Sequence, residues 1–108
     1  LKRNKNFKNR VFSNKEINLS SKGKNKTHYF AKRFGAKEAF VKALGTGISD
    51  KLSFNEIEIL NNKKGRPVLK VKGKSYKIVK KIIKKQFKTF LTLSDEKTIA
   101  VASVIIAI

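Results

Sequence analysis

The sequence predicts one domain of the α+β class over residues 1–108, with one long helix packed on a small antiparallel sheet. Helical periodicity dominates the first half of the chain, whereas alternating and β-branched segments fill the second half. With 40% apolar residues, 108 residues can build one small core. A sequence without cysteine and with one histidine excludes a disulfide scaffold and the usual zinc sites, so a bound metal is expected to be Mg²⁺ with oxygen ligands.

A short first helix is expected around Phe7 and Val11, because residues four apart lie on one helix face. It ends near Ser13, which opens an S-x-x-E pattern with Glu16 that is typical of a helix N-terminus. The polar segment 20–27 is then predicted to be a loop.

The strongest element is a helix from about Tyr29 to Leu44, with Thr27 as its N-cap. Gly45 follows this helix and suits the left-handed conformation that ends many helices. Large apolar side chains share one face and small side chains line the other, so both faces are expected to be buried. The single His28 is predicted to cap the start of the helix or to lie on the surface.

Glu38 and Lys42 are four residues apart and are expected to lie on a narrow strip between the two packed faces. The simplest interpretation is an ordinary ion pair along the helix, which contributes a few tenths of a kcal/mol. The alternative is chemical, because a carboxylate beside lysines, followed by a loop with free backbone N–H groups, suits Mg²⁺ and a pyrophosphate. That loop is Gly45-Thr46-Gly47.

A hairpin is expected in the middle of the chain. Alternation within residues 52–60 predicts a strand, and the Asn/Lys/Gly cluster at 61–65 is a turn signal. Alternation resumes at 68–71, which places Pro67 at the edge of the hairpin.

The C-terminal third contains one ambiguous segment and one clear hairpin. Residues 75–87 fit either a helix with lysines on its outer face or a β-branched strand. Segments 90–93 and 99–108, separated by a predicted turn at 94–97, are expected to pair as a terminal hairpin.

The formal charge of +20 arises from 27 lysines and arginines against 7 acidic residues. This charge suits anionic partners, yet 23 of the cations are lysine and only 4 are arginine, the residue favoured for bidentate contacts to bases and phosphates. Lysine, asparagine and isoleucine are enriched together, which an AT-rich coding sequence would also produce. A basic RNA- or ribosome-associated protein is therefore an alternative of lower rank, and nucleic acid is not the expected partner.

No apolar run is long enough for a membrane span. The longest, residues 99–108, is about half of the roughly 20 residues required. We therefore expect a cytoplasmic protein without a membrane partner.

Two segments together resemble the holo-(acyl-carrier-protein) synthases, the small group of 4′-phosphopantetheinyl transferases. They are RFGAKEAFVKALGTGI at 33–48 and LSFNEIEILNNKKGRPVL at 52–69, which follow the family's order and spacing. The resemblance extends more loosely to the N-terminal helix and to LSDEKTIAVASVII at 93–106. It implies a Mg²⁺-dependent transfer of 4′-phosphopantetheine from coenzyme A to a serine of acyl carrier protein, in fatty acid biosynthesis.

The resemblance also assigns roles to individual residues. It makes Glu38 a Mg²⁺ ligand and Lys42 a contact to the pyrophosphate, and these two are the catalytic residues it implies. A metal ion and a lysine can neutralise the charge that develops in phosphoryl transfer. Around coenzyme A the resemblance places Arg33, Lys42, Gly45, Thr46, Gly47 and Pro67.

The expected partners follow from the same resemblance. The helix bearing Arg3, Phe7 and Arg10 is the one with which the family docks acyl carrier protein, although ordinary amphipathic packing is an equal alternative. Lys24 and Lys26 reach the 3′-phosphate of coenzyme A in one interpretation and belong to a solvated loop in the other. Family members are commonly homotrimers with sites between subunits, which would suit a chain with a small core.

The sequence departs from the family pattern in three places. The family opens with a strand carrying a G-x-D signature, whose aspartate is the second protein ligand of the metal. This chain starts at Leu1, so we expect an N-terminally incomplete domain, with an inactive fragment as the alternative. The closing Ser-x-Ser/Thr-His motif reads Thr92-Leu93-Ser94-Asp95, which leaves Asp95 as a partial substitute for histidine. Segment 71–88 is longer and richer in lysine than its usual counterpart.

Overall fold

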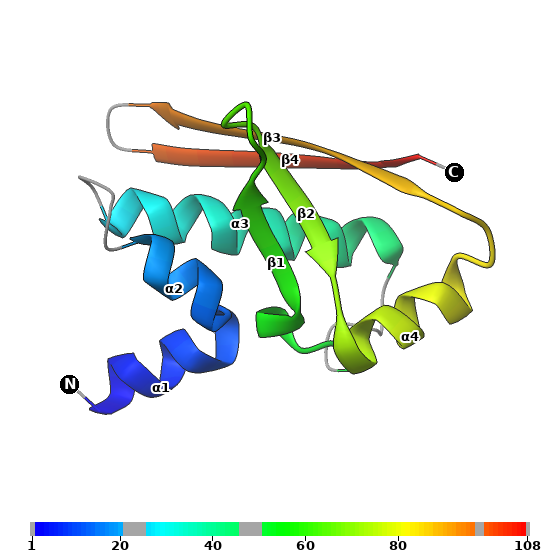
Figure 1. Ribbon diagram of the computed structural model, residues 1–108, viewed down its shortest axis with the longest axis horizontal. Helices are drawn as coiled ribbons and strands as arrows, with labels where there is room; N and C mark the ends of the chain where they lie inside the picture. The colour runs from blue at the N-terminus through cyan, green and yellow to red at the C-terminus, as the bar shows by residue number, and fades with distance from the viewer. Residues whose placement is uncertain (1, 21–25, 46–50, 97–98, 108) are drawn as a thin grey trace.

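The computed structural model describes residues 2–20, 26–45, 51–96 and 99–107, and over these the predicted α+β class is confirmed. One long helix lies along the C-terminal hairpin, and a second, shorter hairpin crosses this helix (Figure 1). The strands therefore form two separate two-stranded antiparallel sheets rather than one small sheet. The elements are α1 (Lys2–Val11), α2 (Asn14–Ser20), α3 (Lys26–Leu44), a short 3₁₀ helix η1 (Phe54–Glu56), β1 (Ile57–Asn61), β2 (Pro67–Val71), α4 (Gly73–Ile82), β3 (Lys88–Glu96) and β4 (Ile99–Ala107).

The turn between α1 and α2 confirms the predicted capping pattern. The Ser13 backbone N–H donates to Glu16 Oε1 at 3.0 Å, and the Glu16 backbone N–H donates to Ser13 Oγ at 3.2 Å. These reciprocal bonds satisfy two N–H groups that a helix start leaves free. Val11 at the end of α1 and Phe12 directly after it are buried, whereas Phe7 within α1 is 56% exposed.

Helix α3 begins three residues earlier than predicted, at Lys26, so Thr27 lies inside the helix and is not its N-cap. Its end agrees with the prediction, because Gly45 follows the helix with φ +119°. The buried stripe of α3 packs into the main core together with residues of both hairpins and of α4. That core contains Ala36, Phe40, Val41, Leu52, Ile57, Ile59, Leu69 and Val79.

The first hairpin forms as predicted, although its strand is shorter at the start. Residues before Ile57 form a turn and η1 instead of strand, and β1 pairs with β2 from Ile57↔Val71 to Asn61↔Pro67. The side chain of Asn62 holds the turn, since its Oδ1 accepts from the backbone N–H groups of Lys64 and Arg66 at 2.9 and 3.0 Å.

Residues 75–82 of the ambiguous segment belong to a helix, α4, whereas residues 83–87 form neither helix nor strand. A carboxylate from η1 caps the start of α4. Glu56 accepts hydrogen bonds from the Lys74 N–H at 3.2 Å and from the Ser75 N–H and Oγ at 3.1 and 2.8 Å. Burial alone would raise the pKa of Glu56, but these hydrogen bonds from Ser75 and Lys74 lower it.

The terminal hairpin is confirmed, but its predicted turn is too long. Ser94, Asp95 and Glu96 belong to β3 and pair with Val101, Ala100 and Ile99, so strand pairing continues through three of the four residues assigned to the turn. Leu91 and Leu93 pack inward with Val104 and Ile106 of β4. Within the described part of the chain, no helix is long and apolar enough to cross a membrane.

Replacing Gly73 by alanine is expected to cost about 2 kcal/mol of unfolding free energy, from left-handed strain and a displaced helix cap. Gly73 has φ +64°, and an added Cβ would overlap the Glu56 carboxylate. Gly65→Ala is the matched control, because Gly65 has φ +81° but nothing within 4 Å of an added Cβ. Urea unfolding of both variants measures the difference, and an equal loss in the two would contradict a role for the cap.

Candidate active site

Glu38 and Lys42 lie on an exposed side of α3, away from the stripe that contains Phe40 and Val41. The expectation that they lie between two packed faces is therefore wrong for this chain. The buried face of α3 includes a charged residue, Lys37, whereas Glu38 and Lys42 are exposed to solvent. The simple alternative also fails, because no ion pair joins Glu38 to Lys42.

The environment of Glu38 fits one ligand of a hard cation. Among the described residues its carboxylate has no hydrogen bond or ion pair, so its oxygens are available. Mg²⁺ keeps several waters and typically takes one or two protein carboxylates, which an exposed glutamate satisfies. Over residues 2–20, 26–45, 51–96 and 99–107 there is no group of three or more acidic or histidine side chains suited to a metal.

A groove opens beside this helix face, between α1, α3 and η1. It has a volume of about 520 Å³, and its wall is mainly apolar, with Arg10 at its edge. Phe34, one helical turn before Glu38, lies 5.9 Å from the ring of Phe54 and 6.3 Å from that of Phe7. An extended, partly apolar substituent would therefore find a surface next to the charged strip.

Arg33, predicted to contact coenzyme A, is buried and only partly satisfied. Its guanidinium stacks 3.8 Å from the ring centre of Tyr29, and its Nη1 donates to the Tyr29 carbonyl at 3.4 Å. Its Nε is buried and has no hydrogen-bond partner within the part of the chain that the structure describes. Burial lowers the pKa of Arg33 and raises that of Tyr29. An unused buried donor costs about 1–3 kcal/mol, so this guanidinium is suited to a further, anionic acceptor.

Of the remaining predicted residues, the structure describes some and not others. Gly45 is exposed at the end of α3, and Pro67 is half-buried in the last pair of the β1–β2 hairpin. Thr46, Gly47 and Lys24 lie outside the described residues, as do the side chains of Arg3, Lys26 and Asp95. His28 lies in the first turn of α3 and is half-buried.

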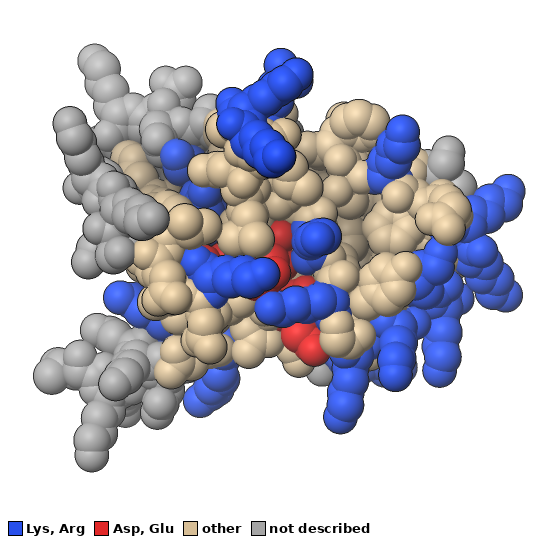
Figure 2. Space-filling view, viewed as in Figure 1, with Lys and Arg blue, Asp and Glu red and all other residues tan. Residues whose placement is uncertain are grey.

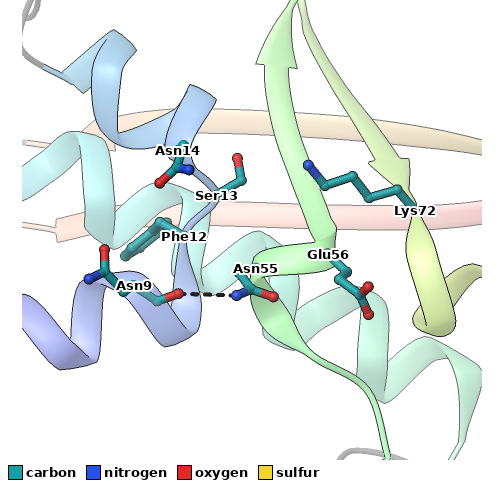
Figure 3. A pocket seen from close by; sticks show the side chains of 7 residues that line it. All are labelled: Asn9, Phe12, Ser13, Asn14, Asn55, Glu56 and Lys72. Carbon is teal, nitrogen blue, oxygen red and sulfur yellow. Dashed lines mark hydrogen bonds between the residues drawn. The ribbon is translucent and has the colours of Figure 1, made fainter.

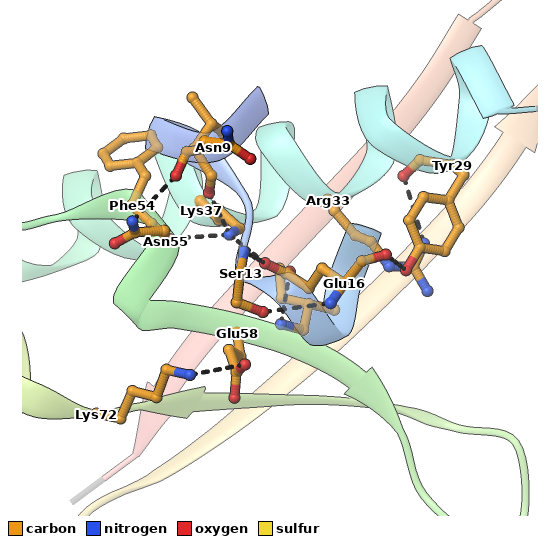
Figure 4. Close-up of polar contacts among 12 residues, drawn as sticks. Asn9, Ser13, Glu16, Tyr29, Arg33, Lys37, Phe54, Asn55, Glu58 and Lys72 are labelled. Carbon is orange, nitrogen blue, oxygen red and sulfur yellow. Dashed lines mark hydrogen bonds and ion pairs between the residues drawn. The ribbon is translucent and has the colours of Figure 1, made fainter. Parts of the chain in front are cut away.

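Sequence reasoning missed a buried ion pair beside this site. Lys37 Nζ lies 2.7 Å from Glu16 Oε1, and both side chains are fully buried (Figure 4). Burial lowers the pKa of Lys37, and Glu16 opposes that shift. The signal in the sequence is a lysine on the same helix face as Phe40 and Val41, because a charge on an apolar stripe requires a partner.

A second ion pair lies nearer the surface. Lys72 Nζ is 2.9 Å from Glu58 Oε2, with the lysine 52% and the glutamate 4% exposed. Burial would raise the pKa of Glu58, but hydrogen bonds from Ser13 and Lys72 lower it. A polar cavity of about 420 Å³, lined in part by Lys72, lies between the α1–α2 turn and η1 (Figure 3).

Lysines cover the outer side of α4 and the segment after it (Figure 2). Tyr76 is the one exposed aromatic side chain on α4, so this surface lacks the aromatic platforms on which single-stranded nucleic acid stacks. The exposed lysines are Lys74, Lys77, Lys81, Lys84, Lys85 and Lys88.

Comparisons with known proteins agree on one family. Residues 1–104 match the family model described as the 4′-phosphopantetheinyl transferase superfamily. The holo-[acyl-carrier-protein] synthase of Pelagibacter ubique is 50% identical over 105 residues, which cover 96% of this chain and 82% of that protein. The complex of Chronobacterium ammoniagenes ACPS with CoA superposes with a TM-score of 0.83 at 29% identity, over 93% of this chain and 79% of that one. Helicobacter pylori holo-[acyl-carrier-protein] synthase in complex with coenzyme A has a TM-score of 0.76 at 30% identity, with 94% and 82% covered.

Proposed function

Because the chain belongs to the holo-[acyl-carrier-protein] synthases of the 4′-phosphopantetheinyl transferase superfamily, we propose that it transfers 4′-phosphopantetheine from coenzyme A to acyl carrier protein. The observation that carries this proposal is the match over nearly the whole chain to synthases, two of which share its fold in complexes with coenzyme A. The holo carrier protein formed in this way serves fatty acid biosynthesis in the cytoplasm.

In this reaction the serine Oγ of the carrier protein attacks the β-phosphorus of coenzyme A. The bond from that phosphorus to the bridging oxygen breaks, adenosine 3′,5′-bisphosphate leaves, and the serine proton passes to a carboxylate or to water. Mg²⁺, when bound, withdraws charge from the pyrophosphate oxygens. Glu38, whose carboxylate has no partner among the described residues, would hold this ion and would supply one of its ligands.

Lys42 contacts the pyrophosphate one turn further along α3. Residues four apart on a helix are neighbours, about 6 Å apart, so an ion at Glu38 and an ammonium at Lys42 can reach adjacent phosphate oxygens. Arg33 and the segment from Gly45 to Gly47, with Pro67, complete the contacts to coenzyme A. The unused Nε of Arg33 supports an anionic ligand at that position.

The protein substrate docks on α1. This helix exposes Phe7, which is 56% accessible, and Arg10 beside it. An apolar anchor next to a cation suits an acidic protein with one apolar side chain at its centre.

A homotrimer would cover the outer face of the terminal hairpin. Phe90 and Ile105 are direct cross-strand partners and are 55% and 64% exposed. Such an apolar pair on a sheet surface favours burial against a neighbouring subunit.

Incubating the full chain with coenzyme A, Mg²⁺ and apo acyl carrier protein is expected to add one phosphopantetheine to the carrier, as measured by intact-protein mass. Chelation of the divalent ion is expected to stop the reaction. A carrier protein with its acceptor serine replaced by alanine controls for non-specific modification. An unmodified wild-type carrier, under conditions where a known synthase modifies it fully, would contradict the proposed function.

A further inference from the structure

Lys37 joins three separate elements to α3 through a single ammonium group. Its Nζ donates to the Val11 carbonyl at 2.6 Å, to Glu16 Oε1 at 2.7 Å and to the Phe54 carbonyl at 2.8 Å. An ammonium has three N–H donors, and all three are used. The acceptors belong to the end of α1, to α2 and to η1. Figure 4 shows Lys37 together with Glu16 and Phe54.

Glu16 extends the same network to the first hairpin. Its Oε1 also accepts from the Ser13 N–H at 3.0 Å, and its Oε2 accepts from the Ile59 N–H at 2.9 Å. The two charged groups therefore make four further hydrogen bonds, to α1, to the α1–α2 turn, to η1 and to β1. Replacement of either residue would leave several of these groups unpaired.

Stability alone does not account for an ion pair in this position. Removing two charges from water is costly, and a well-packed apolar pair of similar volume often serves a fold equally well. An ammonium held by three fixed oxygens, however, sets both the distance and the direction between the elements that carry them. One further hydrogen bond, from Asn55 Nδ2 of η1 to the Asn9 carbonyl at 3.1 Å, is exposed to solvent, and the ring contact Phe7–Phe34 tolerates sliding.

We propose that Lys37 is a positioning residue that fixes α1 relative to Glu38 and Lys42 of α3. Glu38 follows Lys37 on the same rigid helix, while α1 carries Phe7 and Arg10 on its exposed side. A protein substrate docked on α1 then presents its serine at a set distance from the charged strip of α3. This role rests on the proposed function and adds to it the residue that couples docking to chemistry.

Steady-state transfer assays on the full chain separate this role from general support of the fold. In Lys37→Met the KM for apo acyl carrier protein is expected to rise about tenfold, because a small misplacement of a docked substrate has a large kinetic cost. The Kd for coenzyme A, measured by calorimetry, is expected to stay within about twofold, since α3 itself is intact. Lys72→Met is the matched control: it removes an ion pair of similar length that does not involve α3 and is expected to change neither constant.

Glu16→Gln provides a milder variant, because the amide keeps one oxygen acceptor and should preserve the fold if Lys37→Met does not. In both variants, hydrogen exchange is expected to speed up in α1 while the amides between β1 and β2 stay protected. The double variant Phe7→Ala with Glu16→Gln tests whether Glu16 acts through docking on α1. If it does, the increases in KM for the carrier protein caused by the two substitutions are not additive. An unchanged KM for the carrier protein would overturn the positioning role. So would an equal weakening of carrier and coenzyme A binding, accompanied by faster hydrogen exchange in all elements alike. A wild-type chain without transfer activity would instead overturn the proposed function, and the positioning role with it.

Discussion

Glu38→Gln is expected to lower the rate of phosphopantetheine transfer by about 10³-fold, because in the proposed mechanism it removes the carboxylate of α3 that would hold Mg²⁺ against the pyrophosphate. The amide has the same size and helix preference as the carboxylate. Glu38 is exposed and makes no bond to the described part of the chain, so the substitution breaks no native contact. The melting temperature should therefore stay the same while activity is lost.

The mass assay with coenzyme A and acyl carrier protein measures this loss across a range of Mg²⁺ concentrations. Glu38→Asp is expected to recover part of the rate at raised Mg²⁺, since it keeps the charge but shortens the reach. Ala31→Gln is the matched control, because Ala31 is exposed two turns earlier on about the same side of α3. Full transfer by Glu38→Gln would remove Glu38 from the metal site and with it the assignment of this face of α3.

The parts of the fold that could be predicted from sequence are those fixed by neighbouring residues. The S-x-x-E pattern at Ser13 and Glu16 needs only one turn of helix to form its two bonds. The side chain of Asn62 closes its own turn, so the first hairpin follows from a short local cluster. Strand alternation then fixes the pairing of both hairpins, because a shift by one residue would expose the apolar face.

Segment 75–87 shows why other parts could not be predicted. Its own residues fit a helix and a strand about equally, and the cap that favours the helix is Glu56, which is 19 residues before Ser75. A propensity argument cannot include a cap supplied by another element. The predicted turn at 94–97 failed for a related reason, since pairing with β4 carries the strand through Glu96 against the preference of Ser94 and Asp95 for turns.

The candidate site on α3 stays a prediction from its residues, whereas the expected burial of Glu38 and Lys42 is wrong. Lys37 and Glu38 are adjacent charges, and helix periodicity turns them to different faces. Only the positions of α1, α2 and η1 reveal that Lys37 faces inward, because its acceptors come from those elements. A polar residue on an apolar stripe is therefore evidence for a distant partner, which pattern analysis alone does not supply.

Glu16→Ala is expected to lower the free energy of unfolding by about 3–5 kcal/mol, because it leaves the buried Lys37 ammonium without its counter-charge. The Ile59 N–H, which donates to Glu16 Oε2 at 2.9 Å, loses its acceptor as well. For a small domain this is a large share of a total stability of about 5–15 kcal/mol. Urea unfolding followed by circular dichroism measures the change, with an unchanged m-value as the sign that the same transition is observed.

Lys72→Met is the control for this prediction, because the lysine of its ion pair is 52% exposed and the pair should contribute less than the fully buried one. The paired variant Glu16→Leu with Lys37→Met removes both buried charges and is expected to recover about 2 kcal/mol of the loss. Its KM for the carrier protein should nevertheless remain high, because an apolar pair supplies no bonds to the carbonyls of Val11 and Phe54. A paired variant that regained both stability and a normal KM would show that α1 needs only packing to hold its place. A variant that regained stability alone would show that the ion pair is kept for the geometry it imposes between the docking helix and the strip that carries Glu38.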